Sequence, residues 1–232
     1  MMYILIIVAV VILLIAWVTK DYKTWKALGK GGVPYNLYGW LLVSYYRLKK
    51  RDPFTLDIYQ DRIGSSEDSI RIGELPYREG NRPKIGVHPV PHRQLDQRPN
   101  QEVRELLQRT FDDYVKDHQT KIHFVKSYYE KRNDAITLRE EIEGHPVSKI
   151  TCGEIAHIHP DDSSMHMVFS PTDSSEVIRK GWGERHSLSG SPILGLPDTY
   201  LLIYAPRNAA EVDIVRRLVD GAVQHVCQCT NH

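Results

Sequence analysis

Residues 153–169 read Gly-Glu-Ile-Ala-His-Ile-His-Pro-Asp-Asp-Ser-Ser-Met-His-Met-Val-Phe. His157 and His159 alternate with small or apolar residues, which predicts a strand over 154–159 with both histidines on one face. The Pro-Asp-Asp-Ser segment has turn chemistry, and a returning strand is predicted over 165–169. We therefore expect an antiparallel hairpin.

The turn sets the register of this hairpin. If the turn is centred on residues 161–162, His157 lies opposite His166 and His159 lies opposite Ser164. Directly opposed residues in an antiparallel pair have Cβ atoms roughly 5 Å apart. Three imidazoles are therefore expected to share one small patch.

Two chemistries need such a patch. Neutral imidazole is the commonest ligand for transition metals, and histidine is also the side chain whose ordinary pKa lies nearest neutrality. Ordinary hairpin histidines, hydrogen-bonded to Asp161, Asp162 or the backbone, would produce the same pattern. The spacing of the residues does not separate these three readings.

A second signal follows the hairpin. Ser170 and Pro171 are typical of a helix start, and the predicted helix over 171–180 ends at Gly181. The next residues, Gly-Trp-Gly-Glu-Arg-His over 181–186, predict a loop with an aromatic plane, a cation and a fourth imidazole. Such a loop is suited to a planar, anionic or enolic ligand, but an indole that fills the core would give the same pattern.

Several motifs together resemble the fungal luciferase family, over nearly the whole chain. They are Glu154-Ile155-Ala156-His157-x-His159, His166, Gly181-Trp182-Gly183-x-Arg185-His186, Tyr204-Ala205-Pro206-Arg207-Asn208 and, upstream, Leu75-Pro76-Tyr77-Arg78-Glu79-Gly80-x-Arg82-Pro83. The resemblance implies an oxygenase that adds O2 to a hydroxylated styrylpyrone, hydroxyhispidin, with loss of CO2 and emission of light. It implies no cofactor beyond molecular oxygen.

The motifs and the layout together give a set of candidate site residues. We expect the catalytic group to comprise His157, His159, His166 and Glu154, with a neutral imidazole deprotonating the enolic pyrone. We expect Trp182, Arg185, His186, Arg78 and Arg207 to bind the substrate, and Arg82, His92 and Arg93 are further candidates to line a pocket.

Three other functions remain open. A metal-dependent oxygenase or hydrolase would use His157, His159 and His166 as ligands. A non-catalytic module would bind lipid or an aromatic ligand through the Gly-Trp-Gly loop. A non-luminous family member would act on a different phenolic or ketonic substrate.

The N-terminus predicts a membrane anchor. Residues 1–18 form an uninterrupted apolar run, about 27 Å long as a helix, close to the roughly 30 Å hydrocarbon core of a bilayer. A cleaved signal peptide is the competing reading, but no basic segment precedes the run and Ala16-Trp17-Val18 is a poor cleavage site. Lysines follow the run, so the positive-inside rule places the body in the cytosol, with the endoplasmic reticulum as the expected membrane. The odd cysteine count, Cys152, Cys227 and Cys229, agrees with a reducing compartment.

The remaining chain predicts one α+β domain with a mostly antiparallel sheet and a few helices, preceded by the single transmembrane helix. Expected boundaries are 1–19 for the anchor, 20–51 for a juxtamembrane segment whose apolar run lies in the core or the membrane interface, and 52–232 for the catalytic domain. A net charge of +1 gives no reason to expect nucleic acid. The sequence also has no phosphate-binding glycine loop, paired-cysteine zinc signature or nucleophile elbow.

Overall fold

The computed structural model describes residues 1–64 and 71–228, so Cys229 lies outside the described residues. Its centre is a six-stranded sheet in which every neighbouring pair is antiparallel, in the order β1-β2-β3-β4-β6-β5. The strands are β1 Ile122–Lys126, β2 Asp134–Leu138, β3 Glu154–Ile158, β4 Met165–Val168, β5 Gly183–Arg185 and β6 Tyr200–Ile203. The predicted α+β class with an antiparallel sheet is confirmed.

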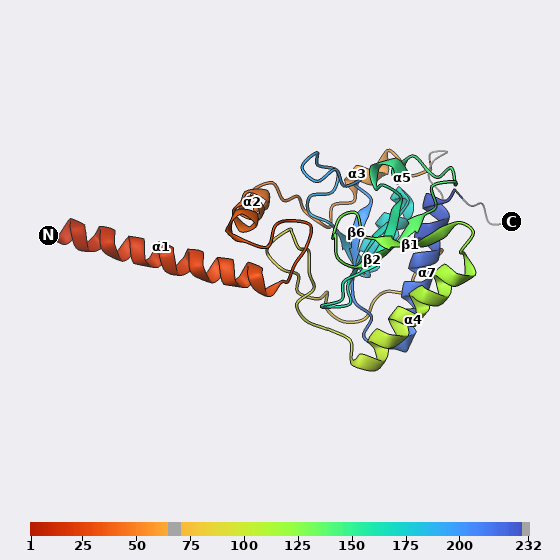
Figure 1. Cartoon of the computed structure of the whole chain (residues 1–232), viewed down its shortest axis with the longest axis horizontal. Coiled ribbons are helices and arrows are strands. Elements are labelled where there is room, and N and C mark those ends of the chain that lie inside the picture. The colour runs from red at the N-terminus through yellow and green to blue at the C-terminus, as the bar shows by residue number, and fades with distance from the viewer. Residues whose placement is uncertain (65–70, 229–232) are drawn as a thin grey trace.

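Helices α4 and α7 pack against each other and against the sheet (Figure 1). The helices are α1 Met2–Ala27, α2 Leu37–Arg47, α3 Asp57–Gln60, α4 Gln101–Asp117, α5 Val147–Ile150, α6 Pro171–Arg179 and α7 Ala209–Val226. The main hydrophobic core lies between the sheet and the apolar sides of α4 and α7. The other side of the sheet is left for the loops that build the site.

Side-chain caps fix where the three longer core helices begin. Asn100 accepts a hydrogen bond from the Val103 N–H at 2.9 Å, and Asn208 accepts one from the Glu211 N–H at 3.0 Å. Ser170 caps α6 in the same way. Each cap satisfies a backbone donor that has no partner within its own helix. The helix start predicted at Ser170 is confirmed.

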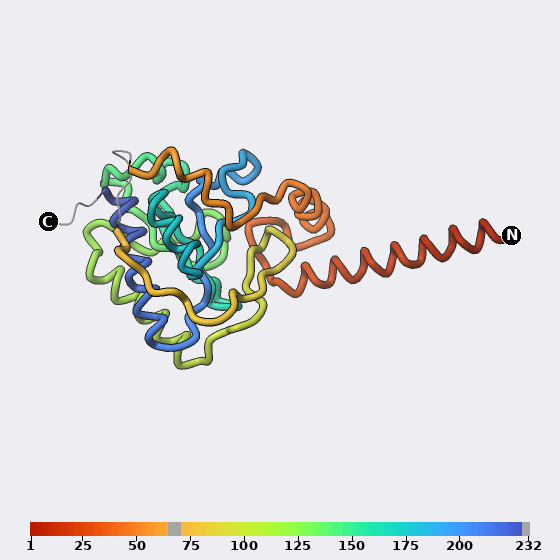
Figure 2. Tube along the Cα trace, turned by 180° about the vertical axis from the view of Figure 1, so that it is seen from behind, coloured from red at the N-terminus to blue at the C-terminus, as the bar shows by residue number. Residues whose placement is uncertain are grey.

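Helix α1 has two unlike parts. Its first turns are exposed and project away from the body (Figure 1, Figure 2), and the helix is long and apolar enough to cross a membrane. Its last turns pack against the body, where Trp25 is buried and its indole donates to the Val90 carbonyl at 2.9 Å. Asp21 joins α1 to α2, accepting from the Trp40 indole at 2.8 Å and the Arg47 guanidinium at 2.7 Å.

Helix α2 has one buried face and one exposed apolar face. Trp40 and Val43 are buried in a small second core together with Trp25. Apolar side chains on the other face remain exposed, among them Leu37, Tyr38, Leu41 and Tyr45. Core packing therefore explains the buried face of α2 but not its exposed apolar face.

The loop predicted over residues 181–186 is partly wrong. Residues 183–185 form the edge strand β5, which pairs with β6. At Gly183 an added Cβ would lie 2.5 Å from the Leu202 carbonyl oxygen, so glycine is needed for the close approach of these two strands. The second glycine of the Gly-Trp-Gly motif therefore serves sheet pairing.

Trp25 tests whether the end of α1 belongs to the folded body. Trp25→Ala removes a fully buried indole and its hydrogen bond, so we expect the free energy of unfolding to fall by about 3–5 kcal/mol, measured by guanidinium denaturation in mild detergent. Trp17→Ala, in the same helix but 57% exposed, is the matched control and should change stability by less than about 0.5 kcal/mol. Equal effects of the two changes would contradict this division of α1.

Candidate functional site

A β-bulge in strand β3 aims the first site residue. His157 pairs with Ala135 of β2, but Thr137 pairs with Glu154, so Ile155 is an extra residue in the strand. Simple alternation would place Glu154 and His157 on opposite faces of the sheet. The bulge brings both to one face, where the Glu154 carboxylate lies 2.6 Å from the His157 Nδ1.

The hairpin register brings three imidazoles together as predicted. His157 is paired with His166, and the His159 N–H donates to the Ser164 carbonyl at 2.8 Å. The ring centroids of His157 and His159 are 5.1 Å apart, and His166 lies 5.4 Å from the first and 4.8 Å from the second. All three rings are buried.

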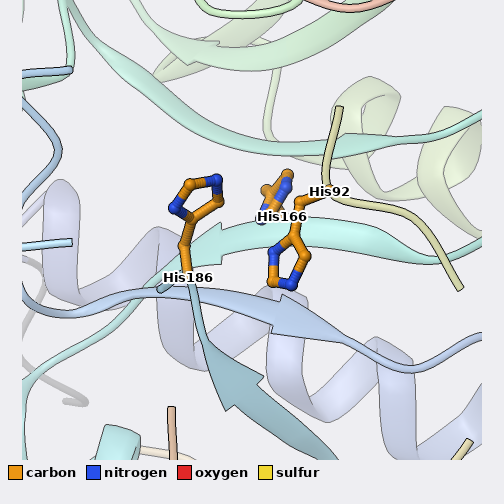
Figure 3. Close-up of side chains that lie close together, drawn as sticks. All are labelled: His92, His166 and His186. Carbon is orange, nitrogen blue, oxygen red and sulfur yellow. The ribbon is translucent and has the colours of Figure 1, made fainter. Parts of the chain in front are cut away.

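Two further histidines extend this group to five. His92, from the loop after Pro91, stacks at 5.5 Å on His166, and its ring meets that of His186 edge-on at 4.8 Å. Figure 3 shows these three rings gathered around one space, His166 from β4 and His186 from the segment after β5. Because they come from distant parts of the chain, no local pattern reveals that they meet.

Hydrogen bonds fix the orientation of three of these rings. The Nδ1 of His157 lies against the Glu154 carboxylate, that of His159 lies 2.8 Å from the Ser164 hydroxyl, and that of His166 lies 3.0 Å from the Leu201 carbonyl. The carboxylate and the carbonyl can only accept, so Nδ1 carries the proton in His157 and His166. In the neutral form of these two rings, Nε2 therefore carries a lone pair.

Burial sets the charge of the cluster. Desolvation, helped by the neighbouring imidazoles, holds the pKa of His159, His166 and His186 well below the ordinary histidine value. Burial also acts to raise the pKa of Glu154, but hydrogen bonds from His157, Tyr128 and Ser127 hold it below its usual range. The site thus holds neutral imidazoles beside an ionised carboxylate.

A cavity of about 270 Å³ opens beside the cluster. His92, His166 and His186 line it, which confirms the prediction that His92 faces a pocket. The other lining residues include aromatic and aliphatic side chains and two charged ones: Val33, Val90, Tyr128, Tyr129, Tyr200, Leu194, Leu196, Glu130 and Lys131. A mostly apolar cavity with a few convergent polar groups is the usual form of a small-molecule site.

Trp182 and Arg185, which the sequence predicts to bind the substrate, do not line this cavity. Trp182 is 4% exposed, packs in the main core and donates its indole N–H to the Pro76 carbonyl at 2.7 Å. The Arg185 guanidinium bonds the carbonyls of Asp52 and Thr55, so it ties the 52–55 segment to the sheet. Strand alternation explains this result, because Arg185 and His186 project to different sides.

Arg78 and Arg207, which belong to the same predicted group, do not line this cavity either. Both pair with Glu211 in the first turn of α7, and Arg78 additionally stacks over the Tyr204 ring. The buried Arg78 and the partly exposed Arg207, paired in this way, hold the 78–83 segment and the segment before α7 to its first turn. Arg82 likewise donates to the backbone, at the Gly183 carbonyl.

Two cavity residues were not anticipated from the sequence. Glu130 lies in the turn between β1 and β2, and Tyr200 stacks on His166 with centroids 4.7 Å apart. Tyr200 begins β6, directly before a run of Leu-Leu-Ile, and therefore has the pattern of an ordinary core residue. Nothing in the sequence around Glu130, a turn rich in lysine and arginine, indicates that this carboxylate lines a cavity.

Comparison with known proteins places the chain in a family. A family model described as a Luciferase domain matches residues 153–222, which include the hairpin, β5, β6 and most of α7. The luciferase of Neonothopanus nambi is 32% identical over 220 residues, covering 90% of this chain and 81% of the relative. The chain belongs to the fungal luciferase family.

Luciferases from other fungi agree with this assignment. Those of Armillaria mellea and Armillaria gallica are 31% and 30% identical over 221 residues, covering 90% of this chain and 82% of each relative. No solved structure matches the chain. Since the similarity to the fungal luciferases covers 90% of the chain, the resemblance read from the motifs is confirmed.

The buried neutral histidines predict a pH-dependent stability. Their folded pKa values lie below that of the unfolded chain, about 6.5, so the unfolded state binds more protons as the pH falls. Each such histidine should remove stability by up to about 1.4 kcal/mol per pH unit below that value. Thermal melts between pH 7.5 and 5 should show the decline.

His186→Asn is the variant that isolates one of these groups. Its amide oxygen can accept from the Leu188 N–H as the His186 Nδ1 does at 3.2 Å, but it does not titrate. The charged and titratable groups around His186 are His92, His166 and Lys50, and all remain. Stability should fall less steeply with decreasing pH in this variant than in the wild type. An unchanged dependence of stability on pH would show that His186 is not held neutral.

Proposed function

We propose that this protein is an oxygenase that adds O2 to an enolic, hydroxylated styrylpyrone of the hydroxyhispidin type. One O2 enters, one CO2 leaves, and the product is a caffeylpyruvate-type acid. The observation that carries the proposal is a set of neutral, buried imidazoles facing a cavity with aromatic walls, in a chain of the luciferase family. No organic cofactor is required, because the electron-rich enolate itself supplies the electrons to oxygen.

His166 is the residue best placed to take the enol proton. It lines the cavity, and because its Nδ1 donates to the Leu201 carbonyl, its Nε2 presents a lone pair. Its lowered pKa keeps it neutral at physiological pH. His92 flanks it on the cavity wall and can hold an oxygen of the pyrone ring, while Tyr200 fixes the plane of the His166 ring.

His157 and His159 lie behind His166, away from the cavity lining, and Glu154 orients His157. Glu154 is thus a positioning residue in this proposal. Also in the cavity lining, the Lys131 ammonium lies over the Tyr128 ring at 4.1 Å. This cation can attract an enolate or the carboxylate of the product.

We further propose that α1 is a retained anchor and that the body faces the cytosol from the endoplasmic reticulum. Lysines follow the apolar part of the helix, and Lys50 and Arg51 follow the exposed apolar face of α2. That face of α2 then lies in the membrane interface. Such an arrangement suits an enzyme whose aromatic substrate partitions into lipid.

The activity is tested by giving the detergent-solubilised chain hydroxyhispidin in air and recording oxygen uptake and photons together. Uptake with light establishes a luciferase. Uptake in darkness keeps the oxygenase and removes luminescence from its role. No uptake by a folded preparation that still binds the pyrone would overturn the proposal in favour of a binding module.

The base is tested by His166→Ala. Loss of general-base catalysis should lower kcat for oxygen uptake by about 10²–10⁴-fold, and His157→Ala should also abolish most turnover, since it removes the support behind His166. His123→Ala, on strand β1 and outside the cluster, is the control and should keep the wild-type rate. Near-wild-type rates in both cluster variants would remove the hairpin from the mechanism.

The anchor is tested by carbonate washing of membranes from cells that express the full chain. A spanning helix resists extraction, so the chain should stay in the pellet, whereas a variant lacking residues 2–18 should be released. A glycosylation sequon placed after Lys30 should remain unmodified if the body is cytosolic. Modification of that sequon would reverse the proposed orientation.

A further inference from the structure

His157 and His159 direct nitrogen atoms at each other. Their Nε2 atoms are 3.2 Å apart, both buried. The His157 Nδ1 donates to Glu154. The Ser164 hydroxyl donates to Asp162 at 2.6 Å, so it accepts from the His159 Nδ1. With both rings neutral, the two Nε2 lone pairs point at each other, and a cation between them, either a metal ion or a shared proton, would remove this repulsion.

Glu130 supplies a third ligand atom. One of its carboxylate oxygens and the two histidine nitrogens all lie within 4.8 Å of one another. Glu130 is held in place twice, because its N–H donates to the Ser127 hydroxyl at 3.0 Å and its carboxylate accepts from Arg93 at 2.5 Å. Ser127 in turn donates to Glu154, the same carboxylate that orients His157.

The charges around this point call for a cation. Glu130, Glu154 and Asp162 are three buried carboxylates, and Arg93 pairs with the first of them. Within the described part of the chain, Glu154 and Asp162 form no ion pair with a lysine or arginine; their partners are His157 and His159. Buried charge of one sign is costly unless it is compensated.

We infer that Glu130, His157 and His159 bind a divalent iron ion. Two histidines and one carboxylate that leave coordination positions open are the ligand set of non-haem Fe(II) oxygenases. Nitrogens 3.2 Å apart subtend about 100° at a metal roughly 2.1 Å from each, which fits two neighbouring ligands. Glu130 lines the cavity, so the site lies against the cavity wall, next to His166. The choice of iron rests on the proposed oxygenase function; the ligand set rests on geometry alone.

The other histidine group, His92, His166 and His186, is less suited to a metal. The His186 Nδ1 accepts from the Leu188 N–H, and the ring also donates to the Pro89 carbonyl. Both nitrogens of His186 are therefore engaged. By contrast, the Nδ1 atoms of His157 and His159 bond to Glu154 and Ser164, on the side away from the proposed metal. Metal-bound histidines usually have such a partner on their second nitrogen.

The test is metal content of the full-length chain in detergent. The protein is loaded anaerobically with Fe(II), desalted and assayed by mass spectrometry of the metal. The wild-type chain should retain about one iron per chain, and His159→Ala and Glu130→Gln should each lower retention by about tenfold or more. Glu154→Gln, which weakens the outer shell, should lower affinity by about 10–100-fold. Co(II) loaded in the same way should give visible absorption bands in the wild type alone.

Controls separate metal loss from misfolding. His123→Ala should retain wild-type iron, and near-ultraviolet circular dichroism should show the same tertiary signal in Glu130→Gln as in the wild type. Substoichiometric iron in the wild type would overturn the inference and leave a shared proton between the two rings. Retention that survives Glu130→Gln and His159→Ala but is lost in His166→Ala would also overturn it, because the metal would then belong to the second group.

Failure of the site and failure of the proposed function give different results. Oxygen uptake by a chain that holds no metal would reject the iron site and keep the oxygenase. Stoichiometric iron that depends on Glu130 and His159, with no uptake on hydroxyhispidin, would keep the site and reject the substrate.

Discussion

The carboxylate of Glu154 accepts hydrogen bonds from the His157 Nδ1, the Ser127 hydroxyl and the Tyr128 N–H. These donors come from strand β3 and from the turn between β1 and β2, so one buried group fixes the relative position of both. The His157 ring and the turn that carries Glu130 each depend on it. Removing such a carboxylate would leave three buried donors without a partner, each at a cost of about 1–3 kcal/mol.

A polar cluster of this size needs a rigid surround. The sheet supplies it on one side, where α4 and α7 pack a continuous apolar core. On the other side, the loop that carries His92 is held by the Trp25 indole and by the Asp162 carboxylate, which accepts from the Gln94 N–H at 3.0 Å. The cluster is thus enclosed between a hydrophobic core and a layer of loops tied down by single buried hydrogen bonds. This enclosure is what keeps the histidines neutral.

Local sequence patterns were enough to predict the hairpin, its His157 to His166 pairing and the helix capped by Ser170, because those features depend on residues close in sequence. The contributions of Glu130 and Tyr200 depend on tertiary contacts between distant segments. Trp182 was ambiguous for a physical reason: an indole between glycines fits a ligand wall or a core equally well, and only the position of the Pro76 carbonyl decides between them. Arg78 and Arg185 found partners within the fold, since a buried guanidinium must be paired wherever it lies, and the partly exposed Arg207 pairs with the same glutamate as Arg78.

The bulge at Ile155 has a consequence for recognising related enzymes. The extra residue turns Glu154 toward His157. The number of residues in the spacing Glu-x-x-His therefore matters for the structure, whereas the identities of the two residues between do not. A related chain that lost one residue here would keep every reactive side chain type, yet its carboxylate would point to the opposite side of the sheet. Alignments that place a gap within this strand should therefore be read as marking proteins with a different chemistry, even where all the histidines are matched.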